Sequence, residues 1–192
     1  MLALRAAVTA ANDTMWDRAF GIETAGVDCR PTAYRVLFKL FRALELTPAD
    51  RLIDYGCGRG RVLCLAARLP MQSVVGVELN VASADAARAN LATLRGRQAL
   101  SCSVVTGNAT EFDPTGGTVF YFFNPFGGEV FAKVIDRVRE AAAGSSLPVR
   151  LVYVNPVCRE VLDAANWLGS PEVVHLNAAG LPAVLLYRTI GA

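Results

Sequence analysis

The sequence predicts a doubly wound α/β fold built on a mostly parallel sheet of seven strands. Short apolar runs alternate along the chain with longer segments of helical periodicity, and this alternation is typical of a sheet covered by helices on both faces. The segment 118–123 is apolar without a break from Val119 onward, as expected of a strand buried on both faces of a parallel sheet. In such folds ligands bind beyond the carboxyl ends of the strands.

Each element follows from its local pattern. The first is a helix over 31–46, because Pro31 suits a first helical turn and Leu37, Leu40 and Leu44 fall on one face. Strands are predicted at 51–55, 73–78, 101–106, 118–123, 149–154, 172–176 and 183–188. Helices between them are predicted at 60–69, 82–95, 129–142 and 157–165.

The segment before the first core helix, 16–24, contains aromatic residues and a glycine, with too little periodicity for a long element. Two interpretations are open: a lid over the cofactor or substrate, or a hydrophobic arm packed on the sheet. The predicted organisation is therefore an N-terminal arm or lid, 1–30, followed by one domain, 31–192.

Composition fits a folded domain and excludes several classes of protein. The 192 residues, 53% hydrophobic and 19% charged, suffice for one core and argue against disorder. A net charge of +2 gives no large field to attract nucleic acid or anionic lipid. No apolar run is long enough to span a membrane, and Arg5 interrupts the N-terminal one, which argues against an export signal.

Cysteine and histidine usage indicates a cytoplasmic protein without a metal site. The five cysteines contain no Cys-x-x-Cys pair and are interpreted as reduced residues. They stand at positions 29, 57, 64, 102 and 158. The one histidine, His175, lies in a predicted strand, where a structural or surface role is expected.

The turn after the first predicted strand carries the strongest chemical signal. It reads Asp54-Tyr-Gly56-Cys-Gly58-Arg-Gly60, and glycine-rich backbone between a strand and a helix presents N–H groups to a ligand. A dinucleotide fingerprint would need glycine at position 61, which is Arg61. The Asp54 carboxylate would also repel a pyrophosphate, so the turn favours a cationic ligand.

The next predicted strand ends in an acid, Glu78. A carboxylate offers two acceptor oxygens at the separation of a vicinal diol, and such charge-assisted hydrogen bonds are strong. Glu78 is therefore a candidate for the two hydroxyls of a ribose.

The turn from Asp54 to Gly60 resembles the first motif of the class I S-adenosylmethionine-dependent methyltransferases, an acid followed by three alternating glycines. The resemblance implies a Rossmann-like fold for 31–192 and S-adenosyl-L-methionine as cofactor. It implies that Asp54 orients the loop or accepts from the cofactor's amino group, that Gly56 and Gly58 let the methionine portion approach, and that Glu78 binds the ribose. It further implies cofactor contacts at Cys57, Gly60, Leu79, Asn108 and Ala109.

Asn108 follows the third predicted strand, where this family usually has an acid or amide beside the adenine. Its carbonyl could accept from the adenine amino group while its amide donates to a ring nitrogen. Many relatives have aspartate there, so Asn108 is a departure from the usual pattern. The alternative is that Asn108 shapes the turn.

A second signal ends the fourth predicted strand, in Asn124-Pro125-Phe126. This segment resembles the Asn-Pro-Pro-Tyr motif of amino-directed methyltransferases, without its second proline and its tyrosine, and is distantly similar to the strand-four loop of Dot1-like protein lysine methyltransferases. The Asn124 and Pro125 carbonyls could accept hydrogens from a nitrogen nucleophile, with Phe126 walling the pocket. Alternatively it is a plain strand terminator, since Asn155-Pro156 ends another strand.

The predicted function is an S-adenosylmethionine-dependent methyltransferase that acts on nitrogen of a protein amine or a small molecule. Most of the chain is similar to small uncharacterised bacterial methyltransferase-like proteins with an Asn-Pro-Phe motif. A nucleic-acid adenine N6-methyltransferase is a weaker alternative, because the chain has no spare domain for target recognition and its charge is nearly balanced. A non-catalytic cofactor-binding subunit is the remaining alternative. Arg61 argues against an oxidoreductase. The sequence indicates no particular oligomeric state.

Overall fold

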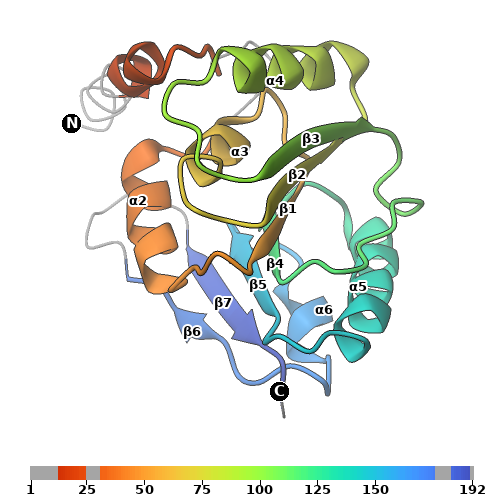
Figure 1. The fold of residues 1–192 in the computed structure, drawn as a ribbon. Helices are drawn as coiled ribbons and strands as arrows, with labels where there is room; N and C mark the ends of the chain where they lie inside the picture. Colours follow the sequence, from red (N-terminus) through yellow and green to blue (C-terminus); the bar gives the residue numbers. More distant parts are fainter. Residues whose placement is uncertain (1–12, 25–30, 176–182, 191–192) are drawn as a thin grey trace, which may run out of the picture.

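The computed structural model of the chain describes residues 13–24, 31–175 and 183–190. Residues 13–20 form a helix ahead of the labelled elements (Figure 1). The further helices are α2 (Tyr34–Ala43), α3 (Arg61–Ala66), α4 (Val81–Thr93), α5 (Gly128–Ala143) and α6 (Arg159–Asp163). The strands are β1 (Arg51–Tyr55), β2 (Ser73–Glu78), β3 (Ser101–Thr106), β4 (Val119–Phe123), β5 (Arg150–Val154), β6 (Glu172–Val173) and β7 (Val184–Arg188).

The strands form one seven-stranded sheet in the order β3-β2-β1-β4-β5-β7-β6. All neighbours from β3 to β5 are parallel, whereas β7 runs antiparallel to both β5 and β6. The strand order reverses direction between β1 and β4, where doubly wound folds open a crevice for a ligand. The predicted fold class is confirmed.

Two hydrophobic clusters, one on each face of the sheet, hold the helices in place. The helices α2, α3 and α4 contribute to one cluster and α5 and α6 to the other; in Figure 1 α2 and α3 lie to the left of the sheet and α5 and α6 to the right. Strand β4 shows why its sequence is continuously apolar. Val119 and Tyr121 belong to the first cluster, while Phe120 and Phe122 belong to the second, because successive side chains point to opposite faces.

Helix α2 begins at Tyr34, three residues later than predicted. Ala33 is extended, with ψ of 139°, and its side chain cannot cap the helix. The cap comes from elsewhere in the chain: the Tyr34 N–H donates to Oδ1 of Asp13, 3.1 Å away. A cap supplied by a residue so distant in sequence explains why Pro31 does not start the helix.

The chain near the carboxyl end contains less regular structure than predicted. Helix α6 has five residues instead of the nine of 157–165. Strand β6 ends at Val173, so His175 is an exposed residue beyond the strand and not part of it. The last residue of the predicted strand, Leu176, lies outside the described residues.

The N-terminal segment packs on helices. Trp16 and Phe20, in the helix 13–20, contact Tyr34 and Phe38 of α2, with ring-centroid distances of 5.0 Å for Trp16–Phe38 and 5.6 Å for Phe20–Tyr34. Aromatic pairs at this separation add stability beyond the area that they bury. The described part of the predicted arm is therefore bound to α2.

Within the described ranges, no helix combines the length and apolar character that crossing a bilayer requires. Cys64, Cys102 and Cys158 are free thiols, and Cys29 lies outside the described residues. Burial raises the pKa of the Cys64 thiol to about 12, as expected of an unreactive core residue.

Candidate cofactor and active site

A cavity of about 1000 Å³ lies at the carboxyl ends of β1, β2 and β4. All but one of the residues predicted to form the site line it. They are Asp54, Gly56, Cys57, Gly58, Glu78, Leu79, Asn108, Ala109, Asn124, Pro125 and Phe126. The ends or following turns of four neighbouring strands, β3, β2, β1 and β4, thus reach one cavity, which has the size of a ligand-binding pocket.

The loop after β1 is attached to β2 and packs closely against the loop after β4. The N–H groups of Gly56 and Cys57 donate to the Val77 carbonyl at 2.8 and 3.2 Å. Gly56 has a φ of 73°, and a Cβ there would stand 2.8 Å from Cβ of Pro125. Glycine is needed at this position because both the backbone conformation and the neighbouring proline exclude a side chain.

Gly60, the exception, lies at the start of α3 and is not part of the cavity lining. Its φ is 83°, and a Cβ there would stand 3.1 Å from Cβ of Ala87 in α4. The structure therefore gives Gly60 a packing role: it lets α3 and α4 approach each other. The predicted contact of Gly60 with the cofactor stays a prediction.

Glu78 fixes the backbone around the cavity. Its Oε2 accepts from the Gly58 N–H and its Oε1 from the Asn80 N–H, each at 2.8 Å. A carboxylate has about four acceptor sites, so both oxygens keep capacity for a further hydrogen bond. Beside it, Leu79 lines the cavity with a side chain that is 72% exposed.

Asp54 is a buried carboxylate in the cavity wall with an unsatisfied oxygen. It is 2% exposed, and its Oδ2 accepts no hydrogen bond from the described residues. Burial, and then the charge of Glu78, raise the pKa of Asp54 well above its ordinary value of 3.8. An ionised carboxylate without a partner is costly in such surroundings, so this wall of the cavity favours a cation.

Asp54 pairs in register with Tyr121 of β4, which also lines the cavity. The Tyr121 hydroxyl lies 2.6 Å from Oγ1 of Thr32, a hydrogen bond in which either group can donate. Thr32 precedes α2 and is itself part of the cavity wall. A polar group from the segment before α2 therefore extends the site beyond the turns that the sequence predicted.

Asn124 occupies the turn after β4 with a φ of 42°, a left-handed conformation that asparagine adopts more readily than most residues. Its Oδ1 lies 3.4 Å from the Tyr153 hydroxyl, which donates to it. The same hydroxyl accepts from the Cys158 N–H at 3.2 Å. The carboxamide is thus oriented by Tyr153 of β5, whose hydroxyl is in turn bonded to the segment after that strand. The half-buried ring of Phe126 packs edge-on against Tyr55.

Asn155 repeats the arrangement of Asn124 one strand further along. It follows β5, has a φ of 51°, and lines the same cavity. The two Asn-Pro dipeptides are therefore neighbouring turns at the carboxyl ends of β4 and β5. In each of them the asparagine both follows the end of a strand and lines the cavity. The repetition of the dipeptide was the signal that could have identified Asn155.

The Asn108 side chain shapes its own turn. Its Oδ1 accepts from the Thr110 N–H at 3.0 Å and from the Thr110 hydroxyl at 2.9 Å. This is the second of the two interpretations of Asn108, and it leaves the backbone of Asn108 and Ala109 at the cavity.

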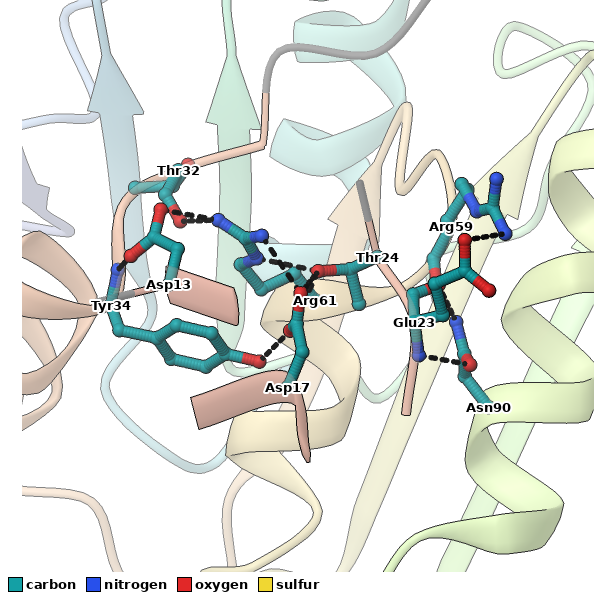
Figure 2. A network of polar contacts seen from close by, with 9 residues as sticks. All are labelled: Asp13, Asp17, Glu23, Thr24, Thr32, Tyr34, Arg59, Arg61 and Asn90. Carbon is teal, nitrogen blue, oxygen red and sulfur yellow. Dashed lines mark hydrogen bonds and ion pairs between the residues drawn. The ribbon is translucent and has the colours of Figure 1, made fainter. Parts of the chain in front are cut away.

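A buried arginine that the sequence interpretation did not assign to the site connects the N-terminal segment to the glycine loop. Arg61, the first residue of α3, is 4% exposed. Its guanidinium donates to Asp13 at 2.7 Å, to Asp17 at 3.2 Å and to the Thr24 hydroxyl at 2.6 Å, as Figure 2 shows. It also lies over the ring of Tyr34, 4.8 Å from the centroid. The four-residue spacing of the two aspartates, one helical turn apart, was the available signal.

These contacts place the carboxyl end of the segment 13–24 in the cavity wall, since Thr24 is one of the lining residues. Arg59, in the glycine loop itself, also lines the cavity and was not predicted. Among the described residues, no group of three or more histidine, cysteine, aspartate or glutamate side chains is arranged to hold a metal ion.

The fold is that of the class I methyltransferases. A solved RNA methyltransferase from Salinibacter ruber, in complex with S-adenosyl-L-homocysteine, superimposes with a TM-score of 0.62 at 22% identity, over 83% of this chain and 92% of that one. No protein-family model matches the chain.

Two curated relatives are methyltransferases as well. The ribosomal protein L11 methyltransferase of Dechloromonas aromatica is 38% identical over 88 residues, 46% of this chain and 29% of the relative. A protein-lysine N-methyltransferase of Saccharolobus islandicus is 32% identical over 96 residues, 48% of this chain and 57% of the relative. The matches thus span less than two thirds of either relative. The resemblance to class I methyltransferases that the glycine loop predicts is confirmed.

Proposed function

We propose that this protein is an S-adenosylmethionine-dependent methyltransferase that transfers the methyl group to nitrogen. The observation that carries the proposal is Asp54, a buried carboxylate with an unpartnered oxygen beside a glycine loop. A cation is the ligand that such a group favours, and the methyltransferase fold and relatives supply the class of cation.

The residues of the cavity fit the cofactor. Asp54 would accept a hydrogen bond from the cofactor's amino group, and Glu78 would accept from the ribose hydroxyls with its remaining lone pairs. The exposed Leu79 would cover a face of the adenine ring. When bound, S-adenosylmethionine supplies a methyl group on a positively charged sulfur. The rest of the chemistry is positioning and exclusion of water.

The acceptor is proposed to be nitrogen because of the turn after β4. The Asn124 carboxamide is held by Tyr153, and its oxygen can accept a hydrogen from an amine or amide so that the nitrogen lone pair is free to attack. Phe126 and Phe123 line the cavity with it. They would lower the charge of an amine by disfavouring its protonated form.

A protein amine or a small molecule is the acceptor that we favour. Both curated relatives carry names that refer to protein acceptors, ribosomal protein L11 and protein lysine. The structural neighbour named as an RNA methyltransferase keeps a nucleic-acid acceptor as the second candidate. We place the reaction in the cytoplasm, since Cys64, Cys102 and Cys158 are free thiols.

Calorimetric titration with S-adenosylmethionine and with NAD tests the cofactor. We expect binding of the former and none of the latter, and tighter binding of NAD would end the methyltransferase proposal. Incubation with cofactor labelled in its methyl group and a cell lysate then tests the acceptor, because label in protein, nucleic acid or metabolites separates the candidates.

A silent cofactor-binding subunit would bind S-adenosylmethionine without transferring its methyl group, and Asn124→Ala tests which residue acts if transfer is observed. For an enzyme we expect methyl transfer to fall far more than cofactor affinity, because Asn124 is proposed to hold the acceptor. An equal loss of both would point to misfolding or a cofactor role, and an unchanged rate of transfer would remove Asn124 from the active site.

A further inference from the structure

Two cations, Arg59 and Arg61, are found among the described residues that line the cavity. Arg61 has its hydrogen-bonding groups occupied by Asp13, Asp17 and Thr24. Arg59 is different: its one ion pair with a described residue joins Nη2 to Oε1 of Glu23 at 3.7 Å. Arg59 is therefore the cavity cation with capacity for a ligand.

The contact between Arg59 and Glu23 is weak. At 3.7 Å it lies beyond hydrogen-bond distance, and the Glu23 side chain is 79% exposed, a setting in which ion pairs contribute little. The Arg59 Nε is buried and donates to no described residue. A buried donor without an acceptor is unfavourable, so Arg59 would gain from a better-placed carboxylate.

The backbone of both residues is fixed independently of this ion pair. Asn90 of α4 donates from Nδ2 to the Arg59 carbonyl at 2.9 Å and to the Glu23 carbonyl at 2.7 Å. Its Oδ1 accepts from the Glu23 N–H at 2.9 Å. Figure 2 shows these contacts beside the ion pair. The Arg59 side chain can therefore exchange Glu23 for a ligand without movement of the loop that carries it.

Arg59 and Asp54 give the same cavity unsatisfied groups of opposite charge. Asp54 has an oxygen without a partner and Arg59 a nitrogen without one. A ligand that carries both an ammonium and a carboxylate would offer each of these two lining residues a group of opposite charge.

We propose that Arg59 binds the carboxylate of the cofactor's amino-acid end, and that Glu23 occupies Arg59 when no cofactor is bound. The inference rests on the proposed function, and it makes Arg59 the residue by which the protein distinguishes an amino-acid-bearing nucleoside from one without that group. Arginine suits this role because its planar fork bonds a carboxylate through two parallel N–H groups.

Two compounds with the same nucleoside and sulfur test it: S-adenosylhomocysteine and 5′-methylthioadenosine, which lacks the amino-acid end. The unaltered protein should bind the former more tightly. Arg59→Gln should lower the affinity for S-adenosylhomocysteine by between about tenfold and a hundredfold, the factor that a hydrogen bond to a charged group contributes. The same variant should bind methylthioadenosine with an affinity within about twofold of that of the unaltered protein.

Glu23→Gln is the matched control, because it breaks the same ion pair and keeps the arginine. It should preserve the preference for S-adenosylhomocysteine, and loss of that preference would assign the effect to the ion pair and overturn the inference. Arg88→Gln removes an exposed arginine outside the cavity lining and should change neither affinity.

The inference is also overturned if Arg59→Gln weakens both compounds equally or leaves both unchanged. Should that variant fail to fold, Arg59→Lys carries the test, because lysine keeps the charge and loses the fork; an unchanged preference would then refute the role of Arg59. If the unaltered protein binds neither compound, the proposed function fails, whereas equal binding of both refutes only the inference about Arg59.

Discussion

Asp54→Asn should change stability and cofactor affinity in opposite directions. The substitution keeps the size of the side chain and removes a buried ionisable group that has an unpartnered oxygen among the described residues. We expect the free protein to gain unfolding free energy near neutral pH, by up to about 1.4 kcal/mol for each pH unit between the ordinary and the raised pKa of Asp54. Affinity for S-adenosylmethionine should fall by about 1.5–3 kcal/mol, because a hydrogen bond to a charged acceptor is lost.

The pH dependence follows from the raised pKa of Asp54. Its ordinary value is 3.8. Between that value and the higher one in the folded protein, the unfolded chain has lost the proton while the folded protein retains it. The unfolding free energy therefore falls as the pH rises, by up to about 1.4 kcal/mol per pH unit from this group. Cofactor affinity should rise by up to about tenfold per unit over the same window, since the ionised carboxylate binds the cation.

Calorimetric titration and chemical denaturation at several pH values between about 5 and 8 measure both quantities. Asp54→Asn should remove the contribution of Asp54 to each pH profile. Asp136→Asn, an exposed acid on α5, is the control and should change neither. A variant at position 54 that binds S-adenosylmethionine as tightly as the unaltered protein, with the same pH profile, would refute the reasoning.

Two further substitutions test the loops around the cavity. Glu78→Ala should weaken cofactor binding by about 1.5–3 kcal/mol in calorimetry, and unchanged affinity would remove Glu78 from the site. Gly56→Ala should lower the unfolding free energy by at least about 1–2 kcal/mol in denaturant titrations, because the left-handed backbone and Pro125 both oppose a Cβ. At Gly107 a Cβ would meet no atom within 4 Å, so the unfolding free energy of Gly107→Ala should lie within about 0.5 kcal/mol of that of the unaltered protein. An equal loss of unfolding free energy in both glycine variants would contradict this account.

The sheet was predictable because its signals are local. Each strand is a short apolar run, and the continuous run of β4 indicates its place inside the sheet. The ends of the helices were less predictable, since they depend on partners remote in sequence. Helix α2 starts where Asp13 caps it, and no residue near Pro31 carries that information.

The candidate site was predictable where a residue type is demanded by backbone geometry or charge. Gly56 and Glu78 stand out for this reason and line the cavity. Arg59 and Arg61 were not assigned to the site, because an arginine is expected to be solvated until its partners in the fold are known. Gly60 satisfies the same spacing as Gly56 but packs two helices, a distinction that requires the position of α4.

The buried guanidinium of Arg61 makes the first described helix more than an appendage. A shortened chain starting at residue 31 would lack Asp13 and Asp17 and would leave a positive charge enclosed at the start of α3, where the positive end of the helix dipole lies as well. Truncation of this protein from its amino terminus should therefore destabilise the fold once it removes residues between 13 and 17, although the first strand of the sheet starts only at Arg51.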